Sequence, residues 1–389
     1  MPEKWGGGHV GNTEKIDIHR GLKDVYFDTT QASFIDGGVG KLLYRGYNIH
    51  DLAEYSTFEE VSYLLLYGRL PNHSELQAFD TNLRKDRDIP EAIVGIIDVI
   101  KESHPMDVLR TGISALSAFD PEVRDNSIEA TIRKGLRLTA KAPTIVAIHD
   151  RLRKGKKIVP PDLNLNHAGN FLKMLFDKDP SEEESRIMDV DFILHAEHGP
   201  NASAFAARVT ASTQSDLHSA IVSGVATLKG PAHGGAAEDV MKMAEEIGTP
   251  ENAESYTRKL LEGGGRVMGF GHRVYKAEDP RARHLRARSK DLGEQKGEPK
   301  WFTILSTLYD VMSPYQAKGI FVNVDFYAGS IYQLLGIQDD LFISLFALGR
   351  IPGWTLQVVE QFENNILIRP LSKYTGLMDL AYIPIDQRK

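Results

Sequence analysis

The stretch GFGHRVYKAEDPRA, at positions 269–282, places a histidine and an arginine in a segment that two glycines open. GPAHGGA at 230–236 holds a second histidine, and NVDFYAG at 323–329 holds an aspartate. Glycine permits positive φ angles and lets backbone approach a ligand closely. Two imidazoles, a carboxylate and an arginine are the groups needed to enolise one carbonyl compound and add it to another.

Composition limits the class of protein before any motif is considered. The 389 residues suffice for one large domain or for two to three ordinary ones, and 42% hydrophobic with 25% charged residues is typical of soluble globular proteins. The net charge of -7 argues against a general polyanion binder. Without cysteine there are no disulfides and no thiolate sites. With no apolar export segment and no membrane-spanning run, we expect a cytoplasmic location.

The apolar pattern predicts a mainly α fold with a small N-terminal β-hairpin region. Strands are expected at residues 25–28 and 33–44, the second pair turning at 36–38. Strands and helices do not alternate and no fixed-period repeat occurs, which argues against a parallel sheet and a solenoid. Helices are expected at residues 90–103, 107–118, 127–140, 163–176, 182–210, 215–228, 236–247, 252–261, 283–292, 301–313 and 339–364.

One further helix is expected after Thr57, because Thr57 and Glu60 have capping-box spacing and Pro71 would stop the helix. The glycine-rich segments fall between helices, at Gly230-Pro231 and at 263–265. Such junctions either serve as hinges for an enzyme that closes over its substrates or are ordinary helix C-caps.

His233 would stand just before a helix that opens near Ala236. The positive helix end favours a neutral imidazole, which can donate one hydrogen bond to a developing enolate. The alternative is a solvent-facing loop histidine.

Arg281 follows Asp279-Pro280 at a predicted helix start, nine residues after His272. Its planar fork suits a carboxylate. Alternatively it joins a solvated basic face, or a site for a polyanion such as a nucleotide phosphate, with the neighbouring cations Arg273, Lys276, Arg283, Arg286 and Arg288.

Asp325 has apolar neighbours on both sides, and burial would raise its pKa. It is therefore either a catalytic base or an N-cap for the helix from Phe326 onward. Arg350 and Arg369 also lie in apolar sequence settings, where a charge requires a partner.

His195 and His198 stand three residues apart, one helical turn if the helix continues through them. The spacing is not the i, i+4 of a zinc-binding helix and no third ligand accompanies it, so we expect no metal. One of the two is expected to hydrogen-bond a substrate, with Asn201 nearby.

Taken in order, HAEHGPNASAF, GPAHGGA, GFGHRVYKAEDPRA, NVDFYAG and the FALGR…IRP pair resemble the citrate synthase family in composition and spacing. The front half, from GLKDVYFDTTQASF to LLLYGRLP, is similar to the same family, so the resemblance covers nearly everything after about residue 20. It implies an acyltransferase of the tricarboxylic acid cycle that condenses acetyl-CoA with oxaloacetate and hydrolyses citryl-CoA. It also implies a homodimer with a tail at 1–20, a large helical domain at 21–227 plus 323–389, and a small mobile domain at 228–322.

The resemblance further implies a role for each matched residue. Asp325 would remove the acyl-CoA α-proton, His233 would hydrogen-bond the thioester oxygen, and His272 would polarise the oxaloacetate carbonyl. Oxaloacetate would be bound by His198, Arg281 and Arg350, and by Arg369 of the other subunit. Coenzyme A would lie along Val267, Met268, Gly269, Phe270 and Gly271, and near Lys318. No permanently bound cofactor and no metal are implied.

The sequence departs from the family pattern at Glu197, where aspartate is common, at Gly199, at Ala237 and at Gln357, where histidine is frequent. Each departure could change pocket shape and substrate preference. A 2-methylcitrate synthase using propionyl-CoA, or a bifunctional enzyme, has the same catalytic residues and is the alternative. A non-catalytic acyl-CoA or dicarboxylate sensor is the remaining one.

Overall fold

The computed structural model describes residues 17–22 and 24–388, in two compact units, Met1–Gln31 and Ala32–Lys389. In the described part of the first unit, Arg20–Leu22 forms a single 3₁₀ turn, η1. The strand expected at 25–28 is absent there, and that prediction is wrong. Leu22 and Asp24 have positive φ angles (52° and 60°), which break an extended run, and the Val25 amide closes a turn onto the Leu22 carbonyl. Most of the predicted 1–20 tail lies outside the described residues.

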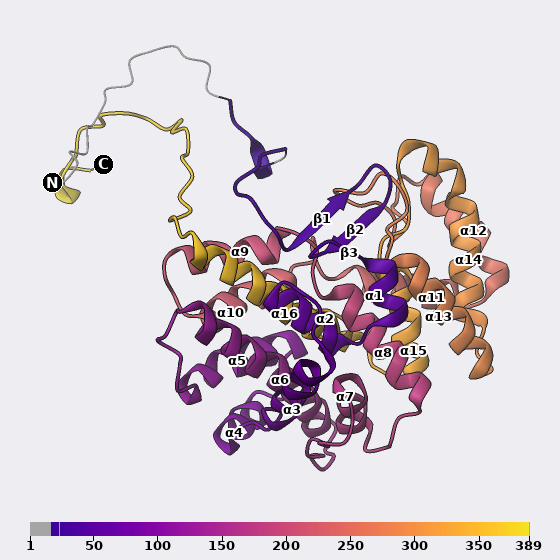
Figure 1. The fold of residues 1–389 in the computed structure, drawn as a ribbon. Coiled ribbons are helices and arrows are strands. Elements are labelled where there is room, and N and C mark those ends of the chain that lie inside the picture. Colours follow the sequence, from indigo (N-terminus) through magenta and orange to yellow (C-terminus); the bar gives the residue numbers. More distant parts are fainter. Residues whose placement is uncertain (1–16, 23, 389) are drawn as a thin grey trace. The chain divides into compact units, whose positions relative to one another are not determined.

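The second unit begins with the predicted hairpin (Figure 1). Strands β1 (Ser33–Asp36), β2 (Lys41–Tyr44) and β3 (Tyr47–Asn48) form a three-stranded antiparallel sheet in that order, with Ser33 opposite Tyr44. The Asp36 carboxylate accepts from the Gly38 amide (2.9 Å) and fixes the turn.

Helices make up most of the second unit, and the mainly α prediction is confirmed. They are α1 (Ile49–Tyr55), α2 (Phe58–Tyr67), α3 (His73–Lys85), α4 (Glu91–Val99), α5 (Pro105–Leu116), α6 (Ile128–Arg153), α7 (His167–Phe176), α8 (Glu182–His195), α9 (Ala202–Ser212), α10 (Leu217–Leu228), α11 (Ala236–Ile247), α12 (Pro250–Glu262), α13 (Ala282–Gln295), α14 (Lys300–Met312), α15 (Asp325–Leu335) and α16 (Phe342–Glu363). Short 3₁₀ turns occupy Ser117–Phe119, Ser313–Lys318, Asp339–Leu341 and Ile385–Gln387. Helices α1 and α3 were not expected, and α15 was expected only as the helix from Phe326 onward that Asp325 would cap.

The helix expected at 182–210 is two helices, and this correction matters for the site. Helix α8 ends at His195, and Gly199 then takes a positive φ of 61°. Asn201 caps α9 by accepting from the Ala204 amide (3.2 Å). His195 and His198 are therefore not on one helix.

Helix α2 also differs from its prediction. Thr57 does accept from the Glu60 amide, but the Glu60 carboxylate bonds the Ser56 hydroxyl (2.5 Å), so only half of the capping box forms. The helix ends at Tyr67, before the left-handed Gly68, and not at Pro71.

Helix α16 runs through the core, packed against α2, α6, α8, α9 and α10. The segment Asp339–Glu363 is long and apolar enough to cross a membrane, but its most apolar window is entirely buried inside the protein. Close packing explains the small residues that face this helix. A Cβ on Gly224 of α10 would stand 3.1 Å from the Trp354 indole.

Helices α11, α12, α13, α14 and α15 pack mainly on one another. The glycine-rich segments form helix junctions, as the sequence predicted, with Gly230-Pro231 between α10 and α11 and residues 263–265 between α12 and α13. Gly264 has a φ of 75° directly after α12, so at that junction the C-cap interpretation holds. The division of the chain into a large and a small mobile domain remains a prediction.

Candidate active site

The GFG stretch is held against the segment that leads into α15. Phe270 forms an isolated antiparallel bridge with Val322, the Gly271 amide donates to Phe321 (2.7 Å), and the Asn323 amide donates to Gly269 (2.9 Å). These bonds fix the loop that carries His272 to the start of the helix that carries Asp325. Two of the three sequence stretches are thus brought together by backbone pairing.

His272 is a neutral hydrogen-bond donor. Its Nδ1 accepts from the amides of Val274 (3.0 Å) and Tyr275 (3.1 Å), which leaves the ring proton on Nε2. Burial, then the charge of Arg281, lowers the pKa of His272 to about 4. The ring therefore stays neutral at pH 7 and can donate from Nε2 to a carbonyl oxygen.

His198 stands beside it, with ring centroids 5.3 Å apart. The His198 Nε2 is 3.1 Å from the Tyr275 hydroxyl, and both residues are buried. Burial, then the charges of Arg281 and His272, lowers the pKa of His198 well below its usual range. The sequence missed Tyr275, although it lies only three residues after His272 in the same motif.

Arg281 has a partner within its own motif. Its Nε and Nη2 bond both carboxylate oxygens of Asp279 (2.9 and 2.7 Å), and both side chains are buried. Burial would raise the pKa of Asp279, but Arg281 overcomes this and the pKa lies below the usual value. Arg281 thus does not belong to a solvated basic face. Farther along α13, Arg286 lies over the Tyr309 ring (4.6 Å).

Arg350 is the least compensated charge in the site. Its side chain is buried, its Nε donates to the carbonyl of His195, and its guanidinium lies over Phe346 (4.8 Å). Both Nη atoms are buried without a hydrogen-bond partner among the described residues. Burial lowers the pKa of Arg350 to about 10. A buried guanidinium with two open donors requires an anion, and a carboxylate fits its fork.

His233 precedes α11 as predicted and is not a solvent-facing loop histidine. Its Nε2 accepts from the Ser203 amide (3.2 Å) and lies 2.9 Å from the Ser203 hydroxyl, which also accepts from the Trp354 indole (3.1 Å). The ring proton is therefore on Nδ1. Burial, then the charge of Arg350, lowers the pKa of His233 to about 4. His233 is a second neutral donor.

Asp325 is not the N-cap of α15, because it is the first residue of the helix and Val324 occupies the cap position. The Asn323 side chain accepts from the Asp325 amide (3.1 Å). The Asp325 side chain is 8% exposed, and no described group hydrogen-bonds its carboxylate. Burial raises its pKa to about 6, although the charges of His195 and Arg281 oppose the rise. A carboxylate that is desolvated and free of donors is a strengthened base.

A buried chain of polar groups lies behind this base. The Tyr332 hydroxyl donates to both carboxylate oxygens of Asp191 (2.9 and 2.8 Å), and His195 Nδ1 bonds the Asp191 carbonyl (2.8 Å). The His195 ring packs on Phe346 (4.5 Å). Sequence reasoning missed Asp191 and Tyr332. The available signal was spacing, because Tyr332 follows Asp325 by seven residues on one face of α15.

Three of the remaining predicted residues lie elsewhere. Arg369 is exposed in the extended segment after α16, and Lys318 ends the 3₁₀ turn Ser313–Lys318 with its amine over Tyr315 (5.5 Å). Val267 is buried at the base of the GFG loop. Within residues 17–22 and 24–388, no group of three or more His, Asp or Glu side chains is arranged to hold a metal ion.

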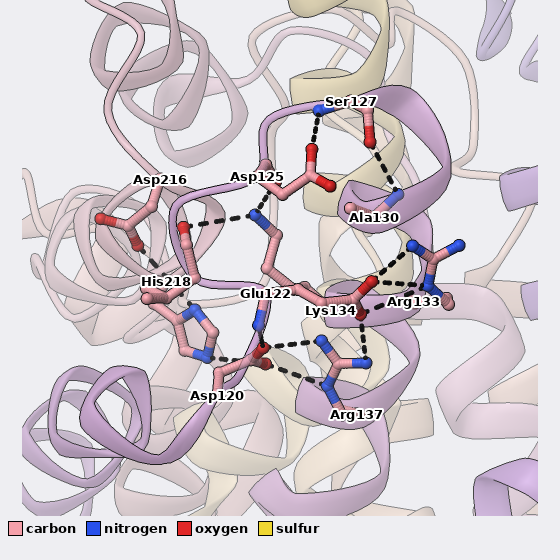
Figure 2. Close-up of polar contacts among 11 residues, drawn as sticks. Asp120, Glu122, Asp125, Ser127, Ala130, Arg133, Lys134, Arg137, Asp216 and His218 are labelled. Carbon is pink, nitrogen blue, oxygen red and sulfur yellow. Dashed lines mark hydrogen bonds and ion pairs between the residues drawn. The ribbon is translucent and has the colours of Figure 1, made fainter.

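A second polar cluster borders a cavity of about 310 Å³ that shares no lining residue with this site (Figure 2). Arg137 bonds Asp120 (2.7 Å) and Glu122 (2.9 Å), and the Lys134 amine donates to the Asp125 carbonyl. The cations of this cluster are paired, so the cluster joins the loop before α6 to that helix. It holds no unpartnered charge comparable to Arg350.

Comparison with known proteins agrees with the geometry. Residues 21–371 match the family described as citrate synthase, C-terminal domain. Citrate synthase from Deinococcus radiodurans is 44% identical over 375 residues, covering 96% of this chain and 100% of that protein. The protein named 2-methylcitrate synthase 1 from Corynebacterium glutamicum is 41% identical over 377 residues, covering 95% and 98%. The crystal structure of citrate synthase from Pyrobaculum aerophilum superposes with a TM-score of 0.91 at 42% identity, covering 95% of each chain.

The resemblance found in the sequence is thereby confirmed over nearly the whole chain and in the fold. Two neutral imidazole donors, a desolvated carboxylate and an arginine with two open donors lie within reach of the charges of Arg281 and Arg350. The chain belongs to the citrate synthase family and is an enzyme of the citrate synthase type, an acyltransferase.

Proposed function

We propose that this enzyme condenses acetyl-CoA with oxaloacetate and hydrolyses the citryl-CoA intermediate to citrate and CoA, as in the tricarboxylic acid cycle. The observation that carries the proposal is the buried Arg350 guanidinium, whose two Nη atoms have no partner among the described residues. A keto acid with carboxylates supplies the missing anion. The charge of Arg281 acts on Asp325, His198 and His272, and the charge of Arg350 acts on His233, so the same substrate would lie beside the base and both donors.

The first chemical step is removal of a proton from the thioester α-carbon by Asp325. Its raised pKa brings its basicity closer to that of the carbon acid, and a positioned base contributes about 10²–10⁴-fold. His233 donates its Nδ1 proton in a hydrogen bond to the thioester oxygen, which holds the developing enolate and contributes roughly 10²–10³-fold. Positioning and exclusion of water supply the remainder of an acceleration of about 10⁶ or more.

The second step is attack of the enolate carbon on the keto carbonyl. His272 donates from Nε2 to that carbonyl oxygen, which withdraws electron density and passes a proton to the new hydroxyl; solvent returns a proton to His272 and receives the one that Asp325 took from the α-carbon. His198, Arg281 and Arg350 hold the carboxylates and orient the carbonyl. Water then cleaves the citryl thioester and releases the CoA thiol.

Release of free thiol tests the proposal directly. Purified protein supplied with oxaloacetate and acetyl-CoA is expected to liberate CoA at a rate that saturates with both substrates. Oxaloacetate alone and acetyl-CoA alone are the controls. Absence of thiol release with acetyl-CoA and with propionyl-CoA would contradict the enzymatic assignment and favour the sensor alternative.

The proposal also specifies which acyl-CoA the enzyme prefers, acetyl-CoA or propionyl-CoA. A relative named 2-methylcitrate synthase is nearly as similar as those named citrate synthase, so propionyl-CoA is the competing substrate. One methylene changes discrimination by only about 1–3 kcal/mol. We propose acetyl-CoA, and the ratio of kcat/KM for acetyl-CoA and propionyl-CoA decides between them.

The proposed homodimer would deliver Arg369 into the partner's site. Support comes from the C-terminal segment, where Leu371 (89% exposed), Tyr382 (82%) and Ile385 (74%) are exposed apolar residues in one chain. Such a segment is expected to be covered by another surface. Placement of CoA along residues 267–271 near Lys318, closure of a small domain at 228–322, and a cytoplasmic location remain predictions from the sequence.

A further inference from the structure

Glu197 is a buried carboxylate with one satisfied and one unsatisfied oxygen. Its Oε1 accepts from the Gly199 amide (2.6 Å), the Gln357 amide (3.0 Å) and the Ser33 hydroxyl (3.1 Å). Its Oε2 is buried without a partner among the described residues. A buried oxygen without a hydrogen bond destabilises the folded protein, so its presence here points to a functional role.

The open oxygen faces the helix that carries Arg350. A Cβ placed on Gly353 would stand 2.8 Å from Glu197 Oε2, and Gly353 follows Arg350 by three residues on α16. Residues three apart share a helix face. The two Nη atoms of Arg350 are also unpartnered, and Glu197 is the acidic group that acts most strongly on Arg350. Two opposite charges are thus buried close together, each with open hydrogen-bonding atoms.

We propose that Glu197 is a positioning residue that sets the affinity for the keto acid through Arg350, and that binding of the substrate carboxylate is coupled to uptake of a proton by Glu197. The inference rests on the proposed function and adds regulation of the same site by pH. In the free enzyme an ionised Glu197 offsets part of the charge of Arg350 without bonding its Nη atoms. The substrate carboxylate bonds those atoms, and two carboxylates beside one guanidinium repel each other unless one is protonated.

The surroundings place this switch near neutral pH. Burial raises the pKa of Glu197 to about 7, and the charge of Arg350 opposes the rise. A bound carboxylate would raise it further. The affinity for the keto acid is therefore highest at pH values where Glu197 is already protonated. It falls as pH rises through about 7, by at most about tenfold per pH unit for one proton.

The other titratable groups around Glu197 would not produce this pH dependence of the affinity near pH 7. Tyr44, whose hydroxyl accepts from the Glu197 amide, has a pKa raised by burial to about 12, and the pKa of His198 is far below neutrality. Arg281 stays charged because Asp279 compensates it. Asp325 also acts on Arg350, but its pKa of about 6 lies lower, and as the base it governs turnover.

Calorimetry of oxaloacetate binding tests the coupling. Titrations in buffers of different ionisation enthalpy, from about pH 6 to about pH 9, measure the protons taken up per site. The parent enzyme is expected to take up a substantial fraction of one proton above pH 7. Glu197→Gln keeps the shape and the three bonds to Oε1, so it should take up none and bind oxaloacetate with an affinity that no longer varies with pH. Its KM for oxaloacetate at high pH should fall while kcat changes little.

The matched control is Glu59→Gln, the same change at another buried glutamate, on α2, whose carboxylate accepts from the His167 amide. It should leave proton uptake as in the parent. Unchanged uptake in Glu197→Gln would overturn the proposal. If that variant fails to fold, Glu197→Asp, which keeps a titrating group, must retain uptake with a shifted midpoint, and an unshifted profile counts against the proposal. A parent enzyme that neither binds oxaloacetate nor releases thiol would instead refute the proposed function.

Discussion

At the scale of single residues, the site depends on which nitrogen of each histidine is free. Ser203 accepts the indole proton of Trp354 and fixes Nε2 of His233, while two backbone amides fix Nδ1 of His272. The two rings therefore present opposite nitrogens as donors. Neither carries a charge at pH 7, so each can stabilise a developing oxyanion without first losing a proton.

Replacing the base should separate chemistry from binding. Asp325→Asn is expected to lower kcat by about 10²–10⁴-fold, because the amide cannot take the α-proton. Oxaloacetate affinity, measured by calorimetry, should remain near that of the parent, since the amide keeps the shape of the side chain. Turnover at parental rates in the variant would show that another group is the base.

The same substitution should stabilise the protein. The pKa of Asp325 is raised from its ordinary 3.8 to about 6, so the folded state binds more protons than the unfolded state between these values. Stability is consequently lost as pH rises through this window, by an upper bound of about 3 kcal/mol. At pH 7 the thermal midpoint of Asp325→Asn should exceed that of the parent, and the gap should vanish below about pH 4. An equal gap at both pH values would contradict the assigned cause.

At the scale of elements, a short backbone pairing joins the GFG loop to the start of α15. Gly269 has a φ of 78°, and a Cβ there would stand 2.6 Å from the Phe326 ring. Both the conformation and the space thus require glycine at this position.

Substitution at this glycine tests the pairing. Gly269→Ala is expected to destabilise the protein well beyond the strain of about 1–2 kcal/mol for a left-handed alanine, and to lower activity by displacing His272 and Asp325. The control is Gly264→Ala, which has a similar φ of 75° and no atom within 4 Å of the new Cβ. Denaturant unfolding and thiol release should show only the strain cost for Gly264→Ala. Equal losses in both variants would mean that the contact with Phe326 is unimportant.

At the scale of the whole molecule, the open question is how Arg369 reaches a site. In the single chain it is exposed, in a C-terminal segment that also exposes many apolar side chains. A two-fold dimer that exchanges these segments would cover the apolar residues and complete both sites at once.

Subunit mixing tests this exchange. Arg369→Ala and Asp325→Asn homodimers should each be nearly inactive. After unfolding and refolding together, half of the dimers are hybrids with one intact site, so about a quarter of the parental activity should return. Sedimentation would verify that dimers re-form. Failure to recover activity from verified dimers would place Arg369 in its own subunit's site or outside it.

Several features could be read from sequence because they are local. The hairpin turn at Asp36, the start of α11 and the cap position of Thr57 depend on a few neighbouring residues, and they were predicted correctly. The break between α8 and α9 was missed, because the helical pattern on its two sides is continuous and the interruption is set by Gly199 and the Asn201 cap.

By itself the sequence determined the mainly α class and the family, and it predicted the types of catalytic group, since these follow from periodicity and from motifs in a fixed order. Only the tertiary structure decided the protonation of those groups, because their burial, and the Ser203 partner of His233, come from segments far apart in the chain. Two departures from the family pattern, Glu197 and Gln357, looked unrelated in sequence, yet they are hydrogen-bonded to each other near Arg350. The stretch at 269–282 supplied His272 and Arg281 together with their partners Tyr275 and Asp279, but only folding aligned this loop with Asp325.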